Sequence, residues 1–319
     1  MTTTNPDIPS RRSEFASDFR ESRASSPTGS GRTITSQAEM KEKIFREFQR
    51  AIFIDDLTAQ GAPLQASLDD VQTVLDHLRD QCNLTHVTMF SGGTSTPDNP
   101  RLPPRGFRVE KLSYEPFTHF LNIIIRAIKE CLTSPRYLET LHFYPHDAQM
   151  LDKLDSEKAL KPDILGLLHS PQVDQISWND VSVFIEVKAD TADMIKQLAT
   201  YARTHLSLNR RRSFSIGIAF NQKGKKMFLQ FLCFHRSGIS TSSKLFLREE
   251  DGFRSVIKHM VGLLSIKDEE EFGLDMTRVN DVYRLNGRDY KIMRTIQMRD
   301  SIRGHATVVY SLQRAELSF

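Results

Sequence analysis

Apolar residues recur at three- and four-residue intervals along several stretches of the chain, which is the spacing of one face of a helix. The pattern predicts helices over residues 39–53, 67–78, 114–128, 191–206 and 251–264. We expect Ser67 to cap the second of these helices and Ser113 to cap the third. Pro116 falls in the first turn of the third helix, where proline is tolerated.

Between these helices the spacing changes to that of β-structure. Short apolar runs predict strands over residues 138–144, 164–168, 181–187, 214–220 and 227–234. From residue 111 onward the order is helix, three strands, helix, two strands, helix. This order predicts an α/β fold in which helices flank a mixed sheet.

Composition divides the chain further. Residues 1–36 are rich in Ser, Thr, Arg and Pro, and we expect them to form a disordered tail. Residues 91–106 contain many Gly and Pro residues and predict a long loop. We therefore expect a helical region with this loop over residues 37–110, an α/β domain over 111–275 and a separate segment over 276–319.

Charge and cysteine content narrow the function classes only a little. A formal net charge of +3 does not by itself indicate a nucleic-acid partner. The three cysteines are widely spaced and form no CxxC pair, which disfavours a disulfide framework or a zinc site and favours a reducing compartment. No apolar run approaches the ~20 residues that span a bilayer, and no signal peptide is evident. We expect an intracellular protein, cytoplasmic or nuclear, without a membrane partner.

Candidate chemistry lies within the α/β region. The residues concerned are Asp163 before one strand, Glu186, Val187 and Lys188 at the end of the next, and Gln197 and Tyr201 on the following helix. Because side chains alternate along a strand, Glu186 and Lys188 point to the same face, and a neighbouring strand can bring Asp163 beside them. Two carboxylates and the Val187 carbonyl are hard oxygen ligands that suit Mg²⁺ or Mn²⁺.

A metal held there would activate water and stabilise charge on a scissile phosphate. Lys188 would orient the water or stabilise the transition state. Gln197 and Tyr201 share one helix face, from which they would steady the site or contact a nucleic-acid backbone. A structural alternative stays open, in which Glu186 and Lys188 lie on a solvated strand face and Asp163 is a turn residue.

This set of residues resembles that of the PD-(D/E)XK nuclease superfamily, which includes restriction endonucleases. The Gln-x-x-x-Tyr helix is similar to that of its RecB-like members. The resemblance implies a metal-dependent phosphodiester hydrolase that acts on DNA or RNA. In that superfamily the leading helix often adds a glutamate near the metal. Glu115 is the matching candidate here, and Glu130 and Glu139 are weaker ones.

Seven basic residues follow the candidate site with no Asp or Glu among them. They are Arg203, Arg210, Arg211, Arg212, Lys223, Lys225 and Lys226. Such a patch would bind phosphates of DNA or RNA. A solvated rim around the strand at residues 214–220 explains the same residues equally well.

The wider sequence, from about Glu115 to Tyr310, resembles the N-terminal region of the fungal-type protein kinase family. The residues that carry this resemblance are Glu115-Pro-Phe, Leu121-Asn122, Lys161-Pro-Asp163, Trp178 before Ile185-Glu186-Val-Lys188, Gln197-Leu-Ala-Thr-Tyr201-Ala-Arg203, Arg211-Arg212-Ser-Phe214 and Phe234-His235-Arg236-Ser-Gly238. The family commonly has an acidic residue where this chain has His235.

In that family a kinase domain follows this region, and residues 276–319 resemble a degenerate start of a kinase N-lobe. Within residues 302–310 only Gly304 remains of the glycine loop that covers ATP phosphates. The strand lysine, H-R-D and D-F-G groups that phosphoryl transfer requires do not follow, so we expect no kinase activity. Two functions remain open: a nuclease, or an inactive regulatory or binding module that engages a kinase domain, another protein or nucleic acid.

Overall fold

The structure is a computed structural model of the chain. It describes Glu39, Glu42, Arg46 and residues 52–54, 57, 64–103, 106–107, 109–133, 136–153, 159–171, 176–223, 226–235, 238–279, 282–286, 288–298 and 308–314. The chain divides into two units, Met1–Ile34 and Thr35–Phe319. The predicted disordered tail lies outside the described residues, and everything below concerns the second unit.

The helices largely follow the predicted ranges. They are α2 (Leu68–Asp80), α3 (Tyr114–Cys131), α4 (Thr191–Leu208) and α5 (Glu250–Leu264), with short 3-10 turns η2 (Thr88–Phe90), η3 (Glu110–Ser113) and η4 (Trp178–Asp180). The cap of α2 is as predicted, because the Ser67 hydroxyl accepts hydrogen bonds from the backbone N–H groups of Asp69 and Asp70. Among the described helices, none has both the length and the apolar character needed to cross a membrane.

Eight strands of the described residues form one mixed sheet. They are β1 (Ile52–Ile54), β2 (His142–Pro145), β3 (Ile164–Leu167), β4 (Val181–Lys188), β5 (Phe214–Asn221), β6 (Phe228–His235), β7 (Gly238–Thr241) and β8 (Leu245–Phe246). Their order is β1-β7-β6-β5-β4-β3-β2, and β8 pairs with β6. Strands β2, β3 and β4 are antiparallel, whereas β4 and β5 are parallel because α4 connects them.

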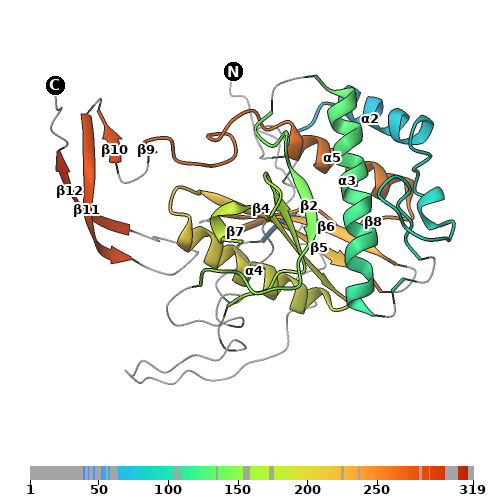
Figure 1. Cartoon of the computed structure of the whole chain (residues 1–319), viewed down its shortest axis with the longest axis horizontal. Coiled ribbons are helices and arrows are strands. Elements are labelled where there is room, and N and C mark those ends of the chain that lie inside the picture. The colour runs from blue at the N-terminus through green and yellow to red at the C-terminus, as the bar shows by residue number, and fades with distance from the viewer. Residues whose placement is uncertain are drawn as a thin grey trace, which may run out of the picture. The chain divides into compact units, whose positions relative to one another are not determined.

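Helices cover both faces of this sheet (Figure 1). On β4, Val183, Ile185 and Val187 belong to the hydrophobic core that α2, α3 and α5 complete. The alternate residues Phe184 and Glu186 contact Tyr201 of α4 on the other face. The strand therefore has buried residues on both faces, which explains why its sequence is a continuous apolar run interrupted only by Glu186 and Ser182.

Three local predictions are wrong. Residues 52–54 form β1, which pairs parallel with β7, rather than the end of a helix; β-branched Ile52 and Ile54 suit an edge strand. The strand predicted over 138–144 begins only at His142, because Leu138 and Leu141 close a turn. Ser113 does not cap α3, because η3 continues directly into the helix and the Ser113 hydroxyl donates to the Glu110 carbonyl instead.

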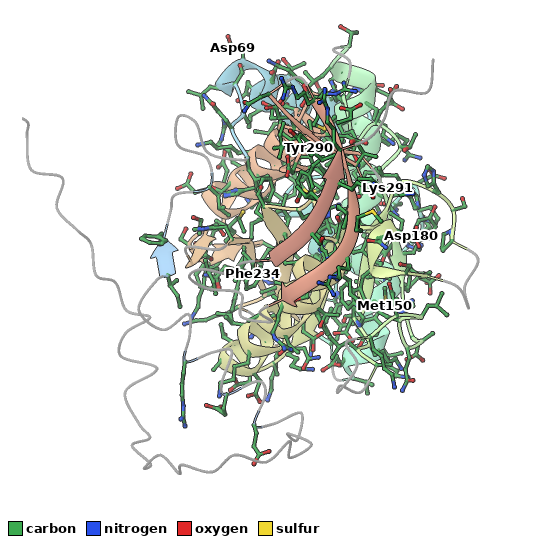
Figure 2. All side chains as sticks on the ribbon, turned by 90° about the vertical axis from the view of Figure 1, so that its left-hand side faces the viewer. Asp69, Met150, Asp180, Phe234, Tyr290 and Lys291 are labelled. Atoms are coloured by element: carbon green, nitrogen blue, oxygen red, sulfur yellow. The ribbon has the colours of Figure 1, made fainter. Side chains whose placement is uncertain are left out.

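A second, antiparallel sheet lies within the C-terminal segment. Its described strands are β9 (Arg278–Val279), β10 (Val282–Leu285), β11 (Arg288–Met298) and β12 (Val308–Arg314), in the order β12-β11-β10-β9. On β11, Tyr290 and Lys291, labelled in Figure 2, are paired across the sheet with Tyr283 and Val282. These strands were not predicted from the apolar pattern.

Candidate active site

Sheet register brings the two predicted carboxylates side by side. Ile164 of β3 is paired with Ile185 of β4, and the Asp163 N–H donates to the Ile185 carbonyl at 3.2 Å. Asp163 therefore lies opposite Glu186 across an antiparallel pair, where side chains on one face are close neighbours. Both side chains lie on the face that α4 covers.

Asp163 is held from two directions. The Tyr114 hydroxyl at the start of α3 donates to Asp163 Oδ1 at 2.5 Å, and the Val187 backbone N–H donates to Oδ2 at 2.8 Å. The Asp163 residue is only 8% exposed. Burial raises the pKa of this carboxyl, and the two hydrogen bonds partly oppose the increase.

Glu186 is buried more deeply, with 2% of its surface exposed. Its Oε1 lies 2.7 Å from Lys188 Nζ, and its Oε2 lies 2.8 Å from the Tyr201 hydroxyl. Burial, followed by the nearby negative charge of Asp163, raises the pKa of Glu186 to about 8. For Lys188 burial lowers the pKa, but Glu186 outweighs it and the pKa is raised, so this lysine stays charged.

Helix α4 supplies the other two predicted residues. Tyr201 lies 2.8 Å from both Glu186 Oε2 and the Lys161 carbonyl, and Gln197 hydrogen-bonds to the Tyr201 hydroxyl. Gln197 and Tyr201 are 7% and 1% exposed. The geometry makes Gln197 a partner of Tyr201 and Tyr201 a partner of Glu186. The structure thus brings together five predicted residues from two strands and a helix.

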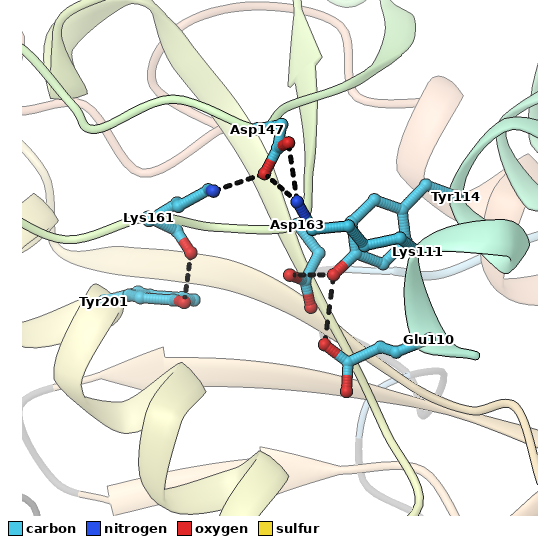
Figure 3. Close-up of polar contacts among 7 residues, drawn as sticks. All are labelled: Glu110, Lys111, Tyr114, Asp147, Lys161, Asp163 and Tyr201. Carbon is cyan, nitrogen blue, oxygen red and sulfur yellow. Dashed lines mark hydrogen bonds and ion pairs between the residues drawn. The ribbon is translucent and has the colours of Figure 1, made fainter.

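Glu115 and Glu110 occupy different positions relative to the site. The Glu115 side chain is 78% exposed, and its carboxylate lies 3.9 Å from His119 Nε2. Glu110, in the turn before α3, has its Oε1 atom 3.1 Å from the Tyr114 hydroxyl (Figure 3). The negative charge of Glu110 also raises the pKa of Asp163. Glu110 is the acidic residue that the sequence interpretation missed, because the 3-10 turn carries it back toward β3.

Two lysines meet one aspartate beside this cluster. The Asp147 carboxylate lies 2.8 Å from Lys111 Nζ and also contacts Lys161 (Figure 3). The side chains of Lys111, Asp147 and Lys161 are 63%, 58% and 42% exposed. The two ammonium groups hold the pKa of Asp147 down at about 2. Exposed lysines thus accompany the buried carboxylates at this end of the sheet.

The seven basic residues do not form one patch. Arg210, Arg211 and Arg212 precede β5, whereas Lys223 and Lys226 follow it, and the two ends of this eight-residue strand are roughly 23 Å apart. Because β4 and β5 are parallel and Lys188 is paired with Asn221, the exposed Lys223 and Lys226 lie at the carboxylate end.

Three of the other basic residues are buried or paired with groups of the protein itself. Arg203 and Arg212 are buried, and Arg212 donates to the Val181 carbonyl and covers the Phe272 ring. Arg211 forms a 2.9 Å ion pair with Glu269. Lys225 lies outside the described residues. A solvated rim is therefore wrong for Arg203 and Arg212.

The donor set fits a hard divalent cation only in part. Asp163 and Glu186 offer carboxylate oxygens on one face, which is the chemistry that Mg²⁺ and Mn²⁺ prefer. Across the described part of the chain, no group of three or more His, Cys, Asp or Glu side chains surrounds a common position. Two carboxylates are therefore in place, and a third protein carboxylate requires a side-chain movement.

Comparison with known proteins finds one family model that is similar to part of the chain. No curated protein and no solved structure gives a significant match. The family model described as Fungal protein kinase matches residues 162–318. This range contains Asp163, Glu186 and Lys188, together with the four-stranded C-terminal sheet. Residues 162–318 are therefore similar to the fungal protein kinase family.

Proposed function

We propose that residues 111–275 form a PD-(D/E)XK nuclease-like domain that hydrolyses phosphodiester bonds of DNA or RNA with Mg²⁺ or Mn²⁺. The element order α3-β2-β3-β4-α4-β5, with three antiparallel strands and then a parallel one, supports this fold. The observation that carries the proposal is that Asp163 and Glu186 are buried side by side with Lys188 at 2.7 Å from Glu186.

Burying two carboxylates together is costly unless a cation compensates them. Lys188 is the one cation that the described contacts place on this pair. The raised pKa of Glu186, about 8, favours a proton on this carboxyl, and a bound divalent ion would take the place of that proton. In the proposed site Asp163, Glu186 and the Val187 carbonyl hold the ion, and Glu110 takes the place that the resemblance suggested for Glu115. A bound divalent ion supplies a Lewis acid and lowers the pKa of its water.

The chain's own groups have separate tasks in this proposal. Lys188 holds the attacking water or stabilises negative charge on the scissile phosphate. Tyr201 orients the Glu186 carboxylate, and Gln197 orients Tyr201. Lys223 and Lys226 contact the nucleic-acid backbone at the same end of the sheet, where neutralising phosphates promotes binding without reading sequence.

The experiment is a cleavage assay with plasmid, single-stranded DNA and RNA, in Mg²⁺, Mn²⁺ or EDTA. We expect Asp163→Asn and Lys188→Ala to reduce metal-dependent cleavage by roughly 100-fold, the effect typical of losing one transition-state contact. The exposed residues Asp98 and Lys267 provide matched controls, and Asp98→Asn and Lys267→Ala should cleave within about twofold of the wild type. Cleavage that survives both site variants would contradict the assignment.

A second function is a regulatory or binding module that uses the same fold without hydrolysis. One observation favours it: each of the four oxygens of Asp163 and Glu186 already accepts a hydrogen bond or ion pair from the protein. Its partner would be a kinase domain, another protein or nucleic acid. Folded protein that binds nucleic acid but cleaves none of the three substrates would support this function.

A further inference from the structure

The proposed metal site is closed in this structure. Asp163 and Glu186 are 8% and 2% exposed, and Tyr114, which covers Asp163, is 7% exposed. A protein-bound Mg²⁺ usually keeps several of its water ligands. An ion of that size cannot reach the two carboxylates unless a covering side chain moves.

Tyr114 is the covering group that lies at the start of a helix rather than within a strand. Asp163 has two described donors, the Val187 N–H and the Tyr114 hydroxyl. The Val187 amide is fixed within β4. Tyr114 instead begins α3, directly after η3, and Lys111 of η3 is held to Asp147 by an ion pair whose side chains are both more than half exposed. An exposed ion pair of this kind holds a turn only weakly.

The Tyr114 hydroxyl lies between two carboxylates. Its oxygen is 2.5 Å from Asp163 Oδ1 and 3.1 Å from Glu110 Oε1, as the two dashed lines in Figure 3 show. A phenol has a single proton to donate, so it satisfies only one of these acceptors at a time. Two carboxylates from different elements that share one small partner form a natural place for a divalent cation.

We propose that Tyr114 is a latch on the metal site. Its hydroxyl occupies the position at which a divalent cation bridges Asp163 and Glu110, and it must swing away before the ion binds. This inference rests on the proposed function, and it adds the residue that controls access. Once Tyr114 has moved, Glu110 supplies the third carboxylate, beside Asp163 and Glu186, that the closed arrangement lacks.

The test is Mn²⁺ binding by the full chain, measured from the EPR signal of the free ion, with no substrate present. Tyr114→Phe removes only the hydroxyl. Because the competing hydrogen bond to a charged group is lost, we expect the Kd for Mn²⁺ to fall roughly tenfold or more. Tyr144→Phe is the matched control, since the hydroxyl of Tyr144, on β2, lies 3.4 Å from Ser170 Oγ, and the Kd of this variant should equal that of the wild type.

The Asp163→Asn variant distinguishes failure of the proposed latch from failure of the proposed metal site. If Asp163→Asn abolishes Mn²⁺ binding but Tyr114→Phe binds no more tightly than the wild type, the latch is overturned and the metal site stands. If neither the wild type nor Tyr114→Phe binds Mn²⁺, or if Asp163→Asn leaves binding unchanged, the proposed metal site itself is overturned.

Discussion

Burial controls the protonation of polar side chains on the α4 side of the sheet, also far from the carboxylates. His205, near the end of α4, has no exposed surface and lies 5.9 Å from both the Trp178 and Phe184 rings. Burial lowers the pKa of His205 well below its usual range, and the positive charge of Arg212 lowers it further. His205 is therefore neutral in the folded protein.

This neutral histidine predicts a loss of stability in acid. Below about pH 6.5 the unfolded chain protonates this residue and the folded chain does not, so stability falls by up to about 1.4 kcal/mol per pH unit from this group. Above that pH it has no effect. Urea unfolding at pH 7.5, 6 and 5 should show a shallower pH dependence for His205→Gln. The exposed His169 is the control, and His169→Gln should keep the wild-type dependence.

An equal pH dependence in the wild type and His205→Gln would show that His205 accepts a proton in the folded state. Such a result would contradict the environment assigned to this residue.

Residue types predicted much of the candidate site. They did not predict the path of the chain just before α3, which brings Glu110 rather than Glu115 to the site. Alternation along one strand was enough to place Glu186 and Lys188 on one face, whereas the position of Asp163 depends on the register of β3 against β4. The acidic residue at the helix was chosen as Glu115 because the apolar pattern starts α3 at Tyr114. Whether a 3-10 turn precedes the helix depends on tertiary contacts, such as the buried hydrogen bond between Tyr114 and Asp163. The sequence pattern does not report those contacts.

At the scale of elements, close backbone approach fixes how α5 packs. A Cβ atom added to Gly262 would lie 2.1 Å from the carbonyl oxygen of Leu64. Leu64 is fully buried and donates its N–H to Leu57. The segment before α2 therefore rests against the backbone of α5 at a position that admits only glycine.

Gly262→Ala is accordingly predicted to destabilise the fold. Alanine gains about 1 kcal/mol in helix propensity, but backbone that cannot withdraw costs typically 1–3 kcal/mol or more. We expect the free energy of unfolding to fall by about 2 kcal/mol in a urea titration. Arg254 is exposed on the same helix, and Arg254→Ala should stay within about 0.5 kcal/mol of the wild type. A more stable Gly262→Ala protein would show that Leu64 does not approach α5.

The type of an element was predictable where its apolar pattern was long. The prediction failed for the short strands β1 and β7. Helices α3 to α5 and strands β4 to β6 repeat their apolar spacing over eight or more residues and were recognised. Strands β1 and β7 are three and four residues long, and their pairing depends on each other. Three residues cannot establish a period, so a neighbouring helical pattern was extended through β1.

At the scale of the whole sheet, the direction of the strands determines which charged side chains lie at the same end. The end of β4 places Glu186 and Lys188 beside the end of β5, because the two strands are parallel. Lys223 and Lys226 therefore lie at the carboxylate end, and Arg210 and Arg211 at the other. A run of basic residues in the sequence is thus divided by the strand that passes through it.

This division predicts which basic residues contribute to nucleic-acid binding. We expect Lys223→Glu with Lys226→Glu to weaken binding of a labelled single strand at least tenfold, and to reduce its salt dependence by about 0.7 per lost phosphate contact. Arg210→Glu with Arg211→Glu makes the same change in charge at the far end, and should leave affinity within about threefold. Fluorescence anisotropy in EDTA, at two salt concentrations, measures both quantities without cleavage.

The comparison distinguishes a directed interface from general attraction to a basic protein. The formal net charge is only +3, so removing four units of charge by either double substitution makes the chain acidic. Long-range attraction would respond equally to both variants, because it depends on total charge rather than on position. Equal losses at the two ends would therefore contradict an interface at the carboxylate end. A loss confined to Lys223 and Lys226 would place the bound strand beside Asp163 and Glu186, where hydrolysis requires it to be.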